Sequence, residues 1–89
     1  MAQREYRLSV KVIREGQPRS YTDSEYEYKE YEYEIEAENC NEYYVKAFCT
    51  GFLRYTGFLR YGYYEFSKIG ENKYRYYVKE PFKEDDINV

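Results

Sequence analysis

Seven glutamates recur at short spacing in the first half of this sequence, and their chemistry is its most distinctive feature. Across residues 25–38 they alternate with tyrosine, isoleucine and alanine. In a β-strand such alternation puts the charged side chains on one face, where a row of carboxylates can bind basic groups. The predicted partner-binding residues are Glu25, Glu27, Glu30, Glu32, Glu34, Glu36 and Glu38.

Two interpretations of this acidic row differ in how specific its role is. In the simpler one it is a solvated sheet face, paired with Arg7, Lys11 and Lys46. In the more specific one it imitates the regularly spaced negative charges of a nucleic-acid strand, because glutamates two residues apart lie about 6.8 Å apart along a β-strand. We therefore expect a non-catalytic interaction module that presents an acidic strand face to a basic protein partner, in its strongest form a nucleic-acid-mimic inhibitor. A structural or assembly subunit is one alternative.

A second set of residues suggests a different chemistry. Residues 51–56 and 57–62 form an imperfect tandem hexapeptide, Gly-Phe-Leu-Arg-Tyr followed by Thr or Gly. Aromatic rings stack on bases and arginine binds phosphate, so Phe52, Arg54, Phe58 and Arg60 are candidates for single-stranded nucleic-acid binding. The formal net charge of −3 argues against this alternative and favours the simpler interpretation, an amphipathic core strand with two surface arginines.

Residues typical of catalytic and metal sites are few. The sequence contains no histidine and no glycine-rich phosphate loop, and a row of equivalent carboxylates gives none of them a reason to have a raised pKa. Cys40 and Cys49 are too few for a zinc cluster, and we expect both to be reduced. The prediction is a protein without enzymatic activity, cofactor or metal.

Size and composition indicate one small domain. Fifteen tyrosines and five phenylalanines among 89 residues must supply much of the core. We expect a β-rich domain over residues 1–82 and a frayed acidic tail over 83–89. Because no apolar run is long enough for a signal peptide or membrane span, a cytoplasmic location is expected. Part-exposed tyrosines make a homodimer plausible, and the abundance of Tyr and Glu is compatible with a thermophilic source.

The first half of the chain predicts two strands. The first covers residues 4–14, where apolar and basic residues alternate. Residues 15–24 contain Gly, Pro and Asp and predict a long loop. The second strand covers residues 25–38, where the alternation changes parity once, so we expect a β-bulge near Lys29-Glu30.

The second half predicts further strands, with one open alternative. A loop over residues 39–41, with Asn41 left-handed, would lead into a strand over 43–49 and onward through the hexapeptides. The alternative is a helix capped by Asn39, with an apolar stripe of Tyr44, Phe48, Phe52 and Tyr55. A last hairpin pairs residues 63–68 with 73–79. The predicted fold is all-β, about five mostly antiparallel strands in a bent sheet or small barrel, or else α+β with one helix within 42–56.

Overall fold

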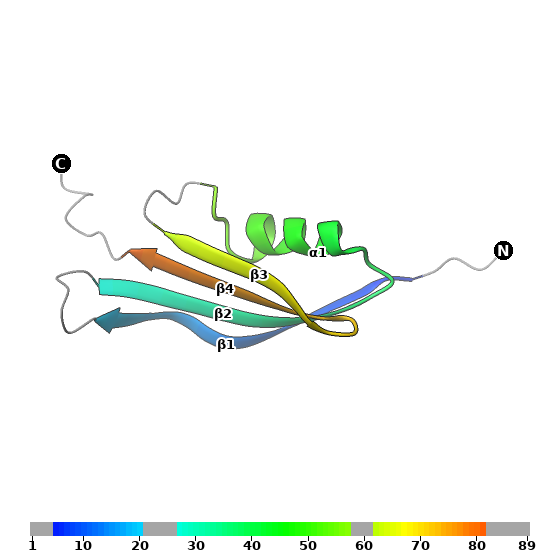
Figure 1. The fold of residues 1–89 in the computed structure, drawn as a ribbon, viewed down its shortest axis with the longest axis horizontal. Helices are drawn as coiled ribbons and strands as arrows, with labels where there is room; N and C mark the ends of the chain where they lie inside the picture. The colour runs from blue at the N-terminus through cyan, green and yellow to red at the C-terminus, as the bar shows by residue number, and fades with distance from the viewer. Residues whose placement is uncertain (1–4, 21–26, 58–61, 82–89) are drawn as a thin grey trace.

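The computed structural model describes residues 5–20, 27–57 and 62–81 as a four-stranded antiparallel sheet with a short helix on one face (Figure 1). The strand order is β1-β2-β4-β3. The elements in chain order are β1 (Arg7–Ser20), β2 (Glu27–Glu38), α1 (Glu42–Phe48), η1 (Cys49–Leu53), β3 (Tyr63–Gly70) and β4 (Lys73–Pro81). The mostly antiparallel β fold is confirmed, the sheet is open and not a barrel, and the helix lies within the range of the alternative prediction.

Strand β1 is longer than predicted. It continues to Ser20, so the loop predicted over residues 15–24 is wrong for its first part. Its pairing with β2 shifts at Val12/Arg14 and again at Glu15/Gln17, which leaves one extra residue at each shift, Ile13 and Gly16. Such bulges let a strand bend without ending. Pro18 is tolerated because β1 is an edge strand and needs no outward N–H.

Strand β2 lacks the bulge predicted near Lys29-Glu30. Its register with β4 is continuous from Tyr28 to Glu36, and the irregularities belong to β1. Tyr28 therefore lies on the opposite face from Tyr31, where Lys79 Nζ is 4.5 Å from the centre of its ring. A tyrosine ring packs favourably under an ammonium group, so Tyr28 is stable on the charged face. The change in parity between Tyr28 and Tyr31 therefore requires no extra residue in the strand.

The segment after β2 forms a helix, so the predicted strand over residues 43–49 is wrong. Asn39 takes the left-handed conformation, with φ of 59°, that was expected of Asn41. Asn41 is instead the N-cap of α1, and its side-chain oxygen accepts a hydrogen bond from the Tyr44 N–H at 2.9 Å. This bond satisfies one of the N–H groups that have no partner within the first turn of a helix. The hairpin prediction did not take this capping interaction of Asn41 into account.

Helix α1 and the π-helical turn η1 bury Val45 and Cys49, not the stripe suggested by the sequence. In that stripe Tyr44, Phe52 and Tyr55 are exposed. The first hexapeptide forms η1 and the segment after it, so its prediction as a strand is also wrong. Most of the second copy, residues 58–61, lies outside the described residues.

The last hairpin is confirmed pair by pair. Tyr64 lies opposite Val78, Phe66 opposite Tyr76 and Lys68 opposite Tyr74. Its turn is shorter than predicted, because Gly70 pairs with Lys73 after a register shift. Strand β4 ends at Pro81, as the sequence predicts, and the predicted tail over 83–89 lies outside the described residues.

The core lies between α1 and the inner face of the sheet and is built mainly from the two central strands. Tyr33 and Tyr76 stack there with their ring centres 6.2 Å apart. Burial raises the pKa of Tyr76 to about 12, and its hydroxyl donates to the Arg54 carbonyl at 2.9 Å. The buried apolar side chains are Tyr31, Tyr33, Ile35, Ala37, Val45, Cys49, Tyr74, Tyr76 and Val78.

Candidate partner-binding face

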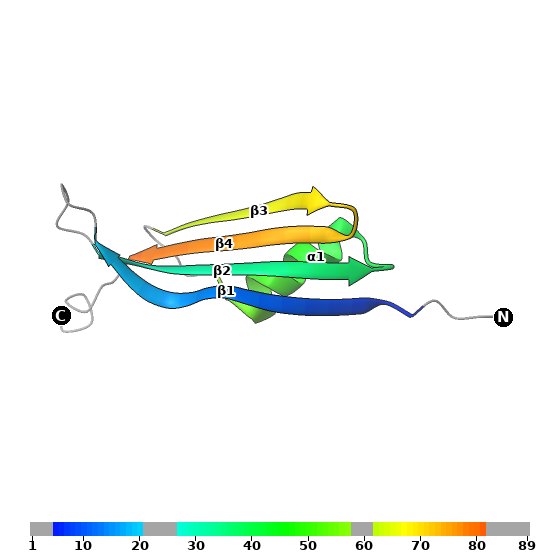
Figure 2. The same cartoon turned by 90° about the horizontal axis from the view of Figure 1, so that it is seen from below.

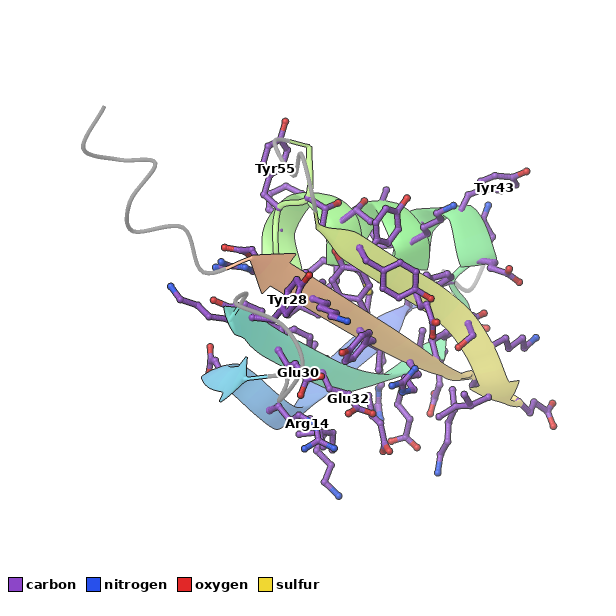
Figure 3. The ribbon with its side chains drawn as sticks, turned by 60° about the vertical axis from the view of Figure 1, so that its left-hand side comes forward. Arg14, Tyr28, Glu30, Glu32, Tyr43 and Tyr55 are labelled. Carbon is purple, nitrogen blue, oxygen red and sulfur yellow. The ribbon has the colours of Figure 1, made fainter. Side chains whose placement is uncertain are left out.

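The sheet face opposite α1, called here the helix-free face, has no described helix over it (Figure 2). Strand alternation places most of the charged side chains of the two central strands on this face. Figure 3 shows Arg14, Glu30 and Glu32 on this side and Tyr43 and Tyr55 on the helix side. Its charged residues are Arg7, Lys11, Arg14, Glu30, Glu32, Glu34, Glu36, Glu38, Glu65, Lys73, Arg75 and Lys79.

Charges on the helix-free face are arranged in rows of alternating sign. The β2 carboxylates form the central acidic row, with basic residues of β1 on one side and of β4 on the other. Glu36 lies between Ser9 and Lys73, and Glu34 lies between Lys11 and Arg75. The twelve charged side chains named above comprise six acids and six bases, so the described face as a whole is mixed in charge and not a continuous acidic surface.

One chain of ion pairs joins all four strands across this face. Glu32 accepts from Arg14 Nε at 3.1 Å and from Arg75 Nε at 2.7 Å. Arg75 also bonds to Glu65 at 3.3 Å, and its guanidinium lies 5.1 Å from the Tyr77 ring centre. The hydrogen bond from Arg75, together with that from Arg14, holds the pKa of Glu32 below its ordinary value despite its partial burial. Glu32 is therefore a structural residue of the sheet.

Glu30 also serves the fold. Its side chain is buried, 8% exposed, and accepts a hydrogen bond from the Tyr77 hydroxyl at 2.5 Å. A buried carboxylate is costly unless it is hydrogen-bonded, so Tyr77 compensates part of that cost. The buried carboxylate of Glu30 is therefore not exposed for a partner to bind.

The other three β2 carboxylates are available to a partner. Glu34, Glu36 and Glu38 are exposed, and none of them forms a salt bridge with any residue in the described part of the chain. A hollow of about 340 Å³ lies beside Glu34 and Glu36 and is also lined by Ser9, Lys11, Ile69 and Lys73. Ser9 is a small side chain in a row of long ones, which helps to explain why the face is hollowed there.

The predicted acidic row is thus divided by the structure into two parts, structural and exposed. Glu25 lies outside the described residues, and Glu27 is the first residue of β2. Lys46, expected opposite the row, is instead on the last turn of α1.

Two of the four residues of the alternative nucleic-acid site, Phe52 and Arg54, lie within the described part of the chain. Arg54 is ion-paired with Glu80, with Nη2 2.6 Å from Oε2, and lies 4.0 Å above the ring centre of Tyr31. Phe52 is 86% exposed and stacks on Phe48 at 6.2 Å. Phe58 and Arg60 lie outside the described residues. The guanidinium of Arg54 is therefore engaged within the fold.

Both cysteines are free thiols. Cys40 is partly exposed, while Cys49 is fully buried and burial raises its pKa to about 12. Among the described residues no group of three or more Cys, Asp or Glu side chains is placed to hold a metal ion. No helix in the described ranges has the length and apolar character needed to cross a membrane.

Comparison with protein-family models, curated proteins and solved structures finds no match for this chain.

The sequence-based prediction placed Arg7 and Lys11 beside the acidic row but not the basic residues of β4. Lys73, Arg75, Tyr77 and Lys79 alternate with the core residues of β4, a period-2 signal as clear as that of the glutamates. It was not connected to the acidic row because β2 was paired with residues 43–49. The pairing of β2 with β4 brings the two rows side by side.

Proposed function

We propose that this protein is a non-catalytic interaction module that binds a protein partner through its helix-free face. Exposed carboxylates on a rigid strand are positioned before binding, so the ordering cost that a disordered acidic segment would incur is reduced. Glu34, Glu36 and Glu38 are the residues that would accept hydrogen bonds from basic side chains of the partner. The observation that carries the proposal is that these three exposed carboxylates have no salt-bridge partner among the described residues, and that two of them, Glu34 and Glu36, line a hollow.

The charge pattern bears on what kind of partner fits. A nucleic-acid mimic needs a surface of continuous negative potential, like a phosphate backbone. Here Lys11 and Lys73 lie beside the exposed glutamates. The rows of alternating sign therefore favour a protein partner whose binding surface is itself mixed in charge, with a lysine or arginine entering the hollow. The mimic is the narrower form of the proposal.

A pair of charge-matched variants tests the proposal. The first is the triple variant Glu34→Gln, Glu36→Gln, Glu38→Gln. The control is Glu15→Gln, Glu42→Gln, Glu71→Gln, three exposed carboxylates outside the helix-free face. Each removes three negative charges, so both raise the formal net charge from −3 to 0. The two proteins differ only in where the charge is lost.

The measurement is affinity capture from host lysate at low and moderate salt, with and without nuclease, followed by mass spectrometry. We expect the face variant to lose the captured protein and the control variant to retain it, since only the first removes the acceptors. Equal loss from both would show that net charge alone matters and would contradict a site on this face. Capture of oligonucleotides in direct contact with the chain would favour the nucleic-acid alternative.

A further inference from the structure

The two edges of the sheet differ in a way that bears on self-association. Strand β1 carries two bulges and a series of basic residues, Arg7, Lys11 and Arg14. Bulges and charges of one sign are the usual protection of an edge against pairing. Strand β3 pairs regularly with β4 from Tyr63 to Lys68, and no described residue pairs with its outer side. The edge formed by β3 lacks the bulges that protect β1 over that run.

The hydrogen bonds of the sheet show which backbone groups of β3 point outward. The Ala37 N–H donates to the Asn72 carbonyl at 2.9 Å, so the pair one step beyond Glu36–Lys73 in the β2–β4 register is a hydrogen-bonded one. Because hydrogen-bonded and non-bonded pairs alternate along an antiparallel ladder, Arg75 and Tyr77 direct their backbone groups toward β3. Their partners Ser67 and Glu65 bond to β4. The backbone groups of Tyr64, Phe66 and Lys68 therefore point outward.

From these features we infer that β3 pairs with the β3 of a second copy of this chain, forming a continuous eight-stranded sheet. A two-fold axis through Phe66 places Phe66 opposite the partner's Phe66 and Tyr64 opposite the partner's Lys68. In this register each of the three facing pairs exchanges two backbone hydrogen bonds. Only the regular part of β3 is used, since the register shift begins after Lys68.

The facing side chains are complementary in this arrangement. Phe66 is half-buried on the helix side, stacked on Tyr74 at 5.3 Å, and Tyr64 is 41% exposed there. Lys68 already lies beside an aromatic ring, with Nζ 5.9 Å from the centre of Tyr74, and the partner's Tyr64 offers it a second one. On the other face Glu65 bonds to Arg75, which limits repulsion between the two copies. A two-fold pairing of β1 between Arg7 and Lys11 would bring basic side chains together, and neither of these two residues forms an ion pair with a described residue.

Spin labels on matched serines of the two edges test this arrangement directly. Ser67 on β3 and Ser9 on β1 are both exposed, and each is replaced singly by Cys in a Cys40→Ser background, where buried Cys49 stays unlabelled. Electron–electron distance measurement should find a short distance between the two labels at position 67, because these positions lie on adjacent strands of the dimer. Labels at 9 should be farther apart than seven strand spacings, which is about 34 Å.

A charge exchange across the seam is the second arm. Tyr64→Lys would set two pairs of like charges opposite each other and should weaken dimerisation about tenfold in sedimentation. Adding Lys68→Glu should restore it, because positions 64 and 68 meet only between copies. A monomer at micromolar concentration with no coupling between labels, a short distance at 9 instead of 67, or no rescue in the double variant would each overturn the inference. The inference is independent of the proposed function, since partner binding uses the face and dimerisation uses the edge.

Discussion

Glu32 is the residue that joins the edge strand β1 to the centre of the sheet on the helix-free face. It receives hydrogen bonds from Arg14 on β1 and Arg75 on β4. Glu34, one position farther along the same face, has no ion-pair partner among the described residues. The two glutamates have the same side chain and lie on the same strand, so their different surroundings separate the structural role of Glu32 from the binding role that we propose for Glu34.

Glu32→Gln should lower the free energy of unfolding by about 1 kcal/mol at neutral pH, because the charge that both arginines bind is lost. The matched change Glu34→Gln should alter it by less than about 0.5 kcal/mol. Urea denaturation measures both. Equal effects would contradict the different roles assigned to these residues.

The effect of Glu32 should also depend on pH in a defined direction. Its pKa in the folded protein is lowered from an ordinary value of 4.5, chiefly by the hydrogen bond from Arg75. A lowered carboxyl pKa stabilises the fold above the unfolded value, and this contribution is lost as the pH falls through the folded value. The stability gap between the natural protein and Glu32→Gln should therefore narrow below about pH 4.5. A gap that widens there would contradict the assignment.

The two thiols should differ strongly in reactivity. Cys40 is partly exposed, whereas Cys49 is fully buried with a pKa raised to about 12. Since the thiolate is the reactive form, iodoacetamide at neutral pH should alkylate Cys40 in the folded protein and Cys49 only after denaturation. Peptide mass spectrometry reads this out. Rapid alkylation of Cys49 in native protein, or a disulfide between the two, would be inconsistent with the structure.

At the scale of elements, the bend of β1 depends on Gly16. This residue has φ of 72°, and a Cβ there would lie 3.0 Å from the Tyr31 hydroxyl oxygen and 3.1 Å from its ring. We expect Gly16→Ala to lower the free energy of unfolding by about 1–2 kcal/mol, through backbone strain and crowding of Tyr31. The control is Gly51→Ala, where a Cβ meets nothing within 4 Å and φ is not positive. It should leave stability unchanged or increase it slightly in thermal unfolding.

Helix α1 depends on its cap. Asn41→Ala should destabilise the protein by about 1 kcal/mol, because the Tyr44 N–H loses its acceptor, while Asn41→Ser should be nearly neutral. Backbone chemical shifts from Glu42 to Phe48 should be helical in all three proteins. Strand-like shifts over this range would contradict the fold described above.

The sequence predicts the elements whose signal is local and misses those decided by distant partners. Alternation alone identifies β2, and alternation with a turn gives the register of the β3–β4 hairpin. The prediction of a strand over residues 43–49 is wrong, although a strand opposite Ile35 is compatible with the sequence pattern. The pairing of β2 with β4 excludes it, because β4 occupies the position beside Ile35. Alternation also indicates that Glu34, Glu36 and Glu38 share one face of β2, whereas placing the basic residues of β4 beside them requires the strand order.

For the whole molecule, the helix and the sheet divide the surface into different chemistries. One sheet face is occupied by aromatic core packing under α1, and the other carries charged rows joined by ion pairs. Ion pairs at Glu32 fix the rows in place, and the unpaired carboxylates beside the hollow are then positioned without further ordering. The central claim is that the partner binds where these carboxylates lie.

The measurement that tests this claim most directly is the amide chemical-shift map of the isotope-labelled protein with its captured partner. Perturbations should concentrate at the residues of the hollow, above all Ser9, Lys11, Glu34, Glu36 and Lys73, and should be absent from the Glu34→Gln, Glu36→Gln, Glu38→Gln variant. Perturbations that concentrate on α1 and around Phe52 and Arg54, with the helix-free face unchanged, would contradict the account.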